Sequence, residues 1–152
     1  MATVGIGTQI CDGLGFAHDH DILHLDLNPN HVLISQIGWV KLVDFRMSRP
    51  FAPGKVGSRR ALPYLSPEEL QEDGEATIDH RADVYSVGKL LWQMVTGRTP
   101  PVHGKDELDL EGVPIEWRTV IENCVRSRPE DRYPNCRELQ AGLMAVEPLV
   151  TD

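Results

Sequence analysis

The 152-residue chain has only three cysteines, and their spacing excludes two common kinds of small domain. Cys11, Cys124 and Cys136 are odd in number, lie far apart and form no C-x-x-C pair. Such a set builds neither a disulfide framework nor a zinc knuckle. We therefore expect three small buried apolar side chains in a reducing compartment, and cytoplasmic localisation.

Positive charge and long apolar runs are also scarce. Fifteen Lys and Arg residues face 23 Asp and Glu residues, and the net charge of −8 argues against a nucleic-acid or anionic lipid partner. No apolar run approaches the ~18 residues of a membrane-spanning helix, and the chain does not begin like a signal peptide. These absences predict a soluble protein with no membrane partner.

The remaining composition, 41% apolar and 25% charged, suits one globular domain. Helical periodicity predicts a first helix at 1–19, a buried central helix at 79–96, terminal helices within 114–146 and a tail at 148–152. Phe16 belongs to the apolar face of the first helix, and Trp39, Trp92 and Trp117 are expected to pack in the core. Apolar runs at 31–34 and 39–43 predict a small β-hairpin. The fold class is therefore mainly α with a small β remnant.

Two segments read as loops. Residues 46–66 carry five Arg and Lys residues and no acid, with several Pro and Gly residues. This segment either binds an acidic partner or is a solvated loop that the acidic residues after it neutralise. Residues 98–113 are rich in Pro, Gly and acidic side chains, with room for at most one helical turn near 106–110.

Four motifs occur in one order: HLDLNPNH at 24–31, DFR at 44–46, PYLSPE at 63–68 and DVYSVG at 83–88. The set resembles the H-R-D-L-x-x-x-N, D-F-G and A-P-E signatures of eukaryotic-type Ser/Thr protein kinases. Two families of small-molecule kinases share the first pattern, but the later motifs and Arg132 favour protein kinases. The resemblance covers 1–147 and implies a kinase-like C-terminal lobe, with a degenerate catalytic loop at 22–34, an activation-type segment at 44–68 and the N-terminal lobe absent.

The resemblance implies a role for each position that touches ATP and magnesium in the family. Asp26 stands at the catalytic base and Asp44 at the metal-binding aspartate, each with the alternative role of a buried acceptor for backbone amides. Four positions depart from the family pattern: Leu25 replaces its arginine, Asn28 its lysine, His31 its metal-binding asparagine and Arg46 its D-F-G glycine. Because magnesium prefers oxygen ligands, an imidazole at 31 predicts a weakened metal position.

The resemblance also implies structural roles. His24 and Phe45 are expected to stack above Asp83, and Glu68 is expected to form a buried ion pair with Arg132. Ser58 is a possible phosphorylation site, although Leu25 could not bind its phosphate. Zinc or manganese binding is a further hypothesis, by His31 with the acids at 26 and 44 or by the histidines at 18, 20 and 24.

The missing catalytic parts predict a truncated pseudokinase lobe, a protein-binding or regulatory module without phosphotransfer of its own and without a cofactor. We expect a partner protein or a second copy on the face that an N-terminal lobe normally covers, where the first helix, Leu33 and Phe45 are exposed. The alternative is half of a Ser/Thr kinase, or a fragment of a longer one, which uses ATP and Mg through Asp26 and Asp44 once an N-terminal lobe completes it. A decaying gene product is a third possibility.

Overall fold

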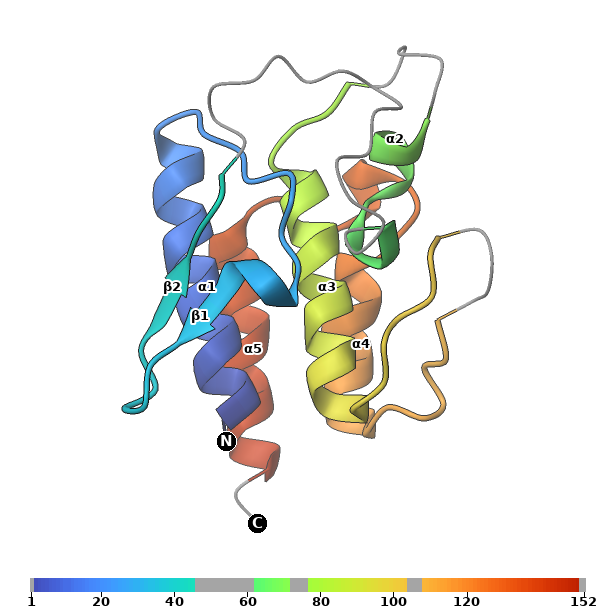
Figure 1. Ribbon diagram of the computed structural model, residues 1–152. Helices are drawn as coiled ribbons and strands as arrows, with labels where there is room; N and C mark the ends of the chain where they lie inside the picture. The colour runs from blue at the N-terminus through green and yellow to red at the C-terminus, as the bar shows by residue number, and fades with distance from the viewer. Residues whose placement is uncertain (1, 46–61, 72–76, 104–107, 151–152) are drawn as a thin grey trace.

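The computed structural model describes residues 2–45, 62–71, 77–103 and 108–150, with the side chains of 147–150 left out. Its helices are α1 (Ala2–Asp19), α2 (Pro67–Leu70), α3 (Arg81–Thr96), α4 (Ile115–Cys124) and α5 (Cys136–Val150). Short 3-10 turns lie at Pro29–His31 (η1), Leu62–Tyr64 (η2) and Pro129–Asp131 (η3), and one sheet pairs β1 (Val32–Ile34) with β2 (Val40–Leu42). This mainly helical fold with a small two-stranded sheet confirms the predicted fold class (Figure 1).

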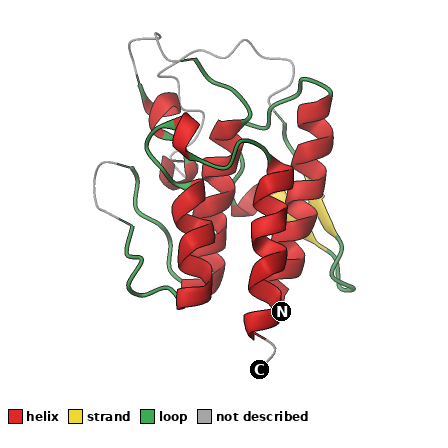
Figure 2. Ribbon diagram, turned by 180° about the vertical axis from the view of Figure 1, so that it is seen from behind, coloured by secondary structure: helices red, strands yellow, loops and turns green. Residues whose placement is uncertain are grey.

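Helix α3 is the centre of the molecule. It packs on α1 and α4, while α5 lies against both α1 and α4 (Figures 1 and 2). Every residue from Ala82 to Trp92 is buried, so the whole circumference of this stretch faces other elements. Gly88 allows the close approach of α4, because a Cβ built there would lie 2.3 Å from the Cβ of Cys124. The helix ends at Gly97, whose φ of 71° is left-handed.

The β-hairpin lies against α1. Its strands are antiparallel, with Val32 opposite Leu42. Gln9 of α1 attaches the hairpin to the helix: its Nε2 donates to the carbonyl of Gly38 at 2.9 Å, and its Oε1 accepts from the amide of Val40 at 3.0 Å. Gly38 has a φ of 86°, which only a residue without a Cβ adopts readily in this turn.

Two sequence predictions about the core are wrong. Trp39 is 69% exposed, because it lies at the end of a hairpin that has no third strand beside it among the residues that the structure describes. Phe16 is 70% exposed on the outer side of α1, where its ring stacks on His20 with 4.5 Å between the ring centroids. Trp92 and Trp117 are buried, as expected.

The end of the last helix differs from the predicted range. Helix α5 continues to Val150, whereas the sequence predicts a tail from 148 onward. Proline has no backbone N–H, so Pro148 removes one hydrogen bond near the end of the helix. Its φ is fixed near the helical value, and the helix therefore continues past it. Residues 108–110 are not helical, and 106–107 lie outside the described residues. In the part of the chain that is described, no helix has the length and hydrophobicity needed to cross a bilayer.

Candidate functional site

Asp83, in the first turn of α3, holds the backbone of the loop at 24–28. Its two carboxylate oxygens accept from the amides of His24, at 2.8 Å, and Leu25, at 2.9 Å. The side chain of His18 contacts the same carboxylate at 2.8 Å, and Asp83 is fully buried. Leu25 has a φ of 60°, a left-handed conformation that costs free energy in a residue with a Cβ. The hydrogen bonds to Asp83 therefore stabilise the strained conformation of the loop at 24–28.

His24 joins this loop to the end of β2. Its Nδ1 accepts from the amide of Asp26 at 3.2 Å, and its Nε2 donates to the carbonyl of Val43 at 2.8 Å. Its ring stacks on Phe45 with 4.4 Å between centroids. Burial lowers the pKa of His24, which favours the neutral ring that this pattern requires. The stacked histidine is thus a structural residue, in the place that the resemblance implies.

The side chain of Asn28 forms hydrogen bonds with the backbone of its own loop. Its Nδ2 donates to the carbonyl of Asp26 at 2.8 Å, its Oδ1 accepts from the amide of Asn30 at 3.0 Å, and the residue is buried. In the family pattern this position carries a lysine. Here the side chain supplies no positive charge, and its hydrogen-bonding groups serve the loop backbone.

His31 lies between the two candidate catalytic acids. Its Nδ1 donates to the carbonyl of Asp26 at 2.7 Å and lies 3.8 Å from the carboxylate of the same residue. Its Nε2 lies 3.4 Å from the carboxylate of Asp44, a residue with a φ of 60° and a side chain that is 73% exposed. The structure therefore brings Asp26, His31 and Asp44 together, with the imidazole ring of His31 between the two carboxylates.

These residues do not fit the magnesium ions that the resemblance implies. Magnesium requires several oxygen ligands in near-octahedral geometry, and the position between the carboxylates holds an imidazole. Among the described residues, no group of three His, Cys, Asp or Glu side chains is arranged to hold a metal ion. The histidines of the other metal hypothesis also diverge: His18 contacts Asp83, and His20 contacts the carbonyl of Phe16.

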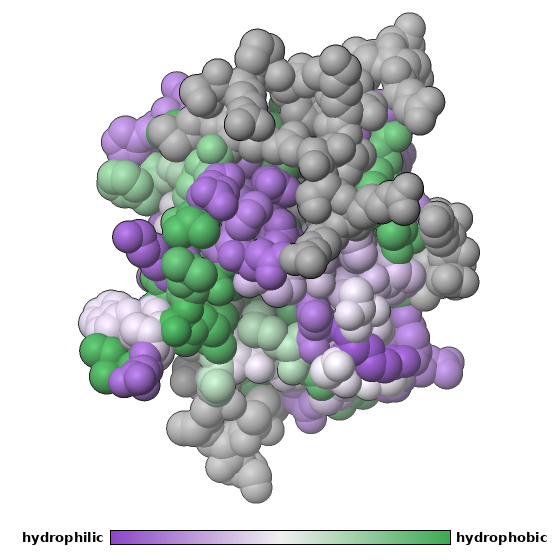
Figure 3. Space-filling view, in the orientation of Figure 1, coloured by the Kyte–Doolittle hydropathy of each residue, from purple (hydrophilic) through white to green (hydrophobic). Residues whose placement is uncertain are grey.

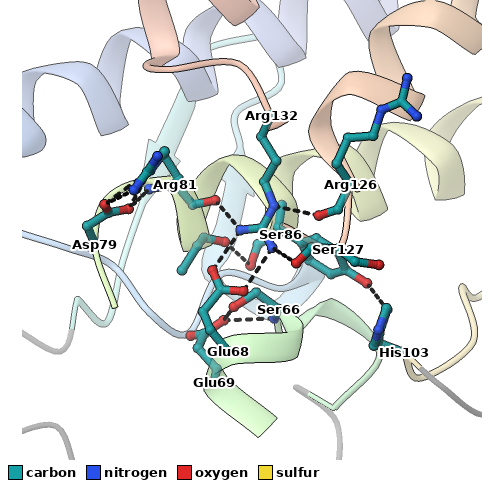
Figure 4. A network of polar contacts seen from close by, with 12 residues as sticks. Ser66, Glu68, Glu69, Asp79, Arg81, Ser86, His103, Arg126, Ser127 and Arg132 are labelled. Carbon is teal, nitrogen blue, oxygen red and sulfur yellow. Dashed lines mark hydrogen bonds and ion pairs between the residues drawn. The ribbon is translucent and has the colours of Figure 1, made fainter. Parts of the chain in front are cut away.

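A buried ion pair joins Glu68 of α2 to Arg132, which precedes α5 (Figure 4). The two residues share two hydrogen bonds, of 2.7 and 2.8 Å. Arg132 also donates to the carbonyls of Arg81, Arg126 and Ser127. A guanidinium has five N–H groups, so every donor of this side chain has a partner. The pair fixes α2 to the helical body, as the resemblance implies.

Glu69 is a buried residue that the sequence interpretation missed. Its carboxylate accepts from the amide and the hydroxyl of Ser66, at 2.8 and 2.7 Å, in a capping box at the start of α2. Burial raises its pKa to about 8, against the two hydrogen bonds that lower it. The S-x-x-E pattern at 66–69 is the signal that identifies such a cap.

Lys89 is a second missed residue, and no local pattern indicates its position. It is buried on α3, where its Nζ donates to the carbonyl of Pro101 at 2.7 Å and lies 5.4 Å from the centroid of the Tyr85 ring. Burial lowers its pKa to about 8. The hydroxyl of Tyr85 contacts His103 at 3.2 Å, so this region is polar but enclosed.

Two predicted site residues, Arg46 and Ser58, lie outside the described residues. Their proposed effects on the metal-binding loop and on phosphorylation stay predictions.

Comparison with known proteins agrees with this geometry. The model of the protein kinase domain matches residues 2–148. Serine/threonine-protein kinase PknB of Mycobacterium leprae is 29% identical over 94% of this chain and 26% of its own length. Serine/threonine-protein kinase PknL of Mycobacterium tuberculosis is 33% identical over 95% and 40%, and a probable serine/threonine-protein kinase of Clostridium acetobutylicum is 30% identical over 95% and 24%. The chain thus spans well under half the length of these curated relatives. With the family model covering nearly its whole length, the chain belongs to the protein kinase family.

Proposed function

We propose that this kinase region is a pseudokinase lobe, a protein-binding or regulatory module without phosphotransfer of its own. The observation that carries the proposal is the position of His31, with its Nε2 3.4 Å from Asp44 and its Nδ1 bound to the backbone of Asp26. Phosphoryl transfer depends on metal ions and cations that neutralise the phosphates. An imidazole between the two acids is a poor substitute for an oxygen ligand.

Two further positions support the proposal. Asn28 is buried and bound to its own loop, so it offers no cation to a transferred phosphoryl group. Leu25 is buried and apolar, so it cannot bind a phosphate on the activation-type segment as an arginine does. Positions 25, 28 and 31 therefore lack the side chains that bind metal ions and phosphate groups in the family pattern.

The protein-binding part of the proposal depends on the hairpin. Apolar side chains gather along it (Figure 3). Four of them are at least half exposed: Leu33 (50%), Ile34 (52%), Ile37 (81%) and Trp39 (69%). Contiguous apolar surface of this kind marks a contact site. A second copy of the chain or another protein covers this surface in the proposed complex.

Thermal unfolding with and without millimolar Mg-ATP tests the loss of nucleotide binding. We expect no change in Tm. A ligand that bound the native state at 100 times its Kd would add about 2.7 kcal/mol of stability, so nucleotide binding would be visible as a rise in Tm. Asp44→Asn is the matched control, since it removes an exposed carboxylate of the site. A rise in Tm that grows with Mg-ATP in the wild type and is lost in this variant contradicts the proposal.

Size-exclusion chromatography with light scattering tests self-association at micromolar concentration. The chain has a mass of 17.0 kDa, and we expect a larger particle. Trp39→Ser and Ile37→Ser should reduce the mass to that of the monomer. Ile115→Ser is the matched control, because Ile115 is 71% exposed on α4, away from the hairpin. A monomeric wild type counts against a homodimer.

A second candidate function is half of an ATP- and magnesium-dependent Ser/Thr kinase, completed by an N-terminal lobe. It is favoured by the presence of both Asp26 and Asp44 and by the intact Glu68–Arg132 ion pair. The test is transfer of labelled phosphate to a peptide by a form that includes an N-terminal lobe. Activity that disappears in Asp26→Asn supports this candidate over the first.

A further inference from the structure

An apolar hollow lies where α1, β1 and α3 meet. It has a volume of about 260 Å³, and its walls include Ile6 of α1, Ile34 of β1 and Met94 of α3. Among the described residues that line it, only Gln93 has a polar side chain, and the carbonyl oxygen of that side chain accepts a hydrogen bond from the hydroxyl of Tyr64. The hollow therefore suits an apolar occupant.

The connection between the two strands of the hairpin projects beside this hollow. It follows β1 directly, so Ile37 stands only three residues after Ile34 in the wall of the hollow. The connection extends past the helices (Figure 1), with Ile37 81% exposed and Trp39 69% exposed. Gln9 of α1 holds it in place through two hydrogen bonds to its backbone. An apolar projection and an apolar hollow thus lie within the length of one hairpin.

The size of the hollow favours a protein side chain over a small molecule. Small-molecule sites have volumes of roughly 300–1,000 Å³, and this hollow has about 260 Å³. In protein interfaces, a few anchor side chains that fill such pockets contribute most of the binding free energy. The expected occupant is therefore an apolar side chain that projects from a protein surface.

A second copy of the chain presents such a side chain. A two-fold dimer needs a surface that is complementary to itself, with projection and hollow on one patch. The hairpin meets this requirement, because Ile34 belongs to the hollow and Ile37 to the projection. Its four exposed apolar side chains, at 50–81%, present roughly 500 Å², against the ~800 Å² that each partner buries in a standard interface. The walls of the hollow add to this area.

We propose that this face is a two-fold dimer interface, in which Ile37 at the end of each hairpin inserts into the hollow of the other copy. This inference rests on the proposed protein-binding module and names its partner. Trp39 packs beside the inserted side chain. Because the symmetry repeats each contact, a substitution in the projection or in the hollow changes both contacts of the homodimer at once.

The experiment uses two variants that each change one half of the contact. Ile37→Asp places a carboxylate in the connection, where a turn accepts it, and Met94→Lys places an ammonium group in the hollow with little change in helix propensity. Light scattering should give the wild type twice the chain mass of 17.0 kDa. Each variant alone should be monomeric, with Kd raised roughly 30-fold or more, as for an anchor residue.

An equimolar mixture of the two variants should recover the dimer. In the mixed pair, one unchanged Ile37 meets one unchanged hollow, and the two introduced charges, which are of opposite sign, face each other. Met144→Lys is the matched control and should dimerise like the wild type, because Met144 is 57% exposed on α5 and does not line the hollow. Circular dichroism checks each fold, and Ile6→Lys on the facing wall replaces Met94→Lys if that variant is unfolded.

The outcomes separate this inference from the proposed function. A wild-type dimer whose folded variants do not associate on mixing overturns the insertion, while the protein-binding module stands. A monomeric wild type at micromolar concentration overturns the dimer, and the module then requires a different protein. Loss of the pseudokinase proposal is detected independently, as a rise in Tm with Mg-ATP.

Discussion

The contact between His18 and Asp83 predicts a specific dependence of stability on pH. Burial by itself lowers the pKa of His18, but the hydrogen bond to Asp83 and the charge of that carboxylate outweigh it and raise the pKa from 6.5 to about 9. The folded state therefore binds a proton that the unfolded state releases between these two values. The corresponding stability is fully present below pH 6.5 and is lost as the pH rises through 9.

The magnitude follows from the same values. One pKa unit corresponds to about 1.4 kcal/mol, so a rise from 6.5 to about 9 contributes roughly 3 kcal/mol to the free energy of unfolding. The His18 side chain is only 9% exposed, and solvent screening is correspondingly small. His18→Gln retains a donor near the position of Nε2 but cannot carry the proton. We expect its deficit against the wild type to be largest near about pH 6 and to shrink as the pH approaches about 9.5.

Urea unfolding of wild type and His18→Gln over this pH range measures the difference. Other groups titrate in the same range, and comparing the two proteins at each pH removes their contribution. His20→Gln on the same helix is the matched control, because His20 is exposed and contacts the carbonyl and the ring of Phe16, with no charged partner. A deficit for His18→Gln that stays constant from the lowest to the highest pH refutes the reasoning.

Three further substitutions test the buried charges. Arg132→Met leaves the Glu68 carboxylate buried without its partner and should cost roughly 3–5 kcal/mol in urea unfolding, whereas Arg128→Ala, in an exposed ion pair, should change stability by less than about 0.5 kcal/mol. Because the folded pKa of Glu69 is raised to about 8, wild-type stability should fall between pH 4.5 and 8, and Glu69→Gln should remove that fall while matching the wild type in acid. The folded pKa of Lys89 is lowered to about 8, so Lys89→Met should be more stable at pH 7, with the gain in Tm shrinking between pH 8 and 10.5; an unchanging gain contradicts a buried cation.

The order of motifs allowed much of the site to be predicted. The family pattern placed His24 beside Phe45 and above Asp83, and the structure has these contacts. Positions that share one family pattern therefore carry over well from the sequence, even where they lie far apart along the chain, as His24 and Asp83 do.

What could not be predicted depends on contacts between distant segments. A tryptophan at position 39 reads as a core residue, and only the absence of a third strand in the described sheet leaves it exposed. Lys89 reads as the polar position of a helix, yet the chain around Pro101 covers it and supplies its acceptor. No local pattern predicts either outcome, because each depends on a segment outside the helix or strand in which the residue lies.

The contacts of Asp83 also give a reason for a family residue to be retained in a protein that has lost catalysis. One side chain accepts hydrogen bonds from the amides of His24 and Leu25 and contacts His18, so replacing it damages the folded core whether or not the protein transfers phosphate. Natural selection for a foldable protein is enough to retain it. The side chain at position 31 contacts its own loop and Asp44, so replacing it removes contacts of the candidate site rather than of the helical core.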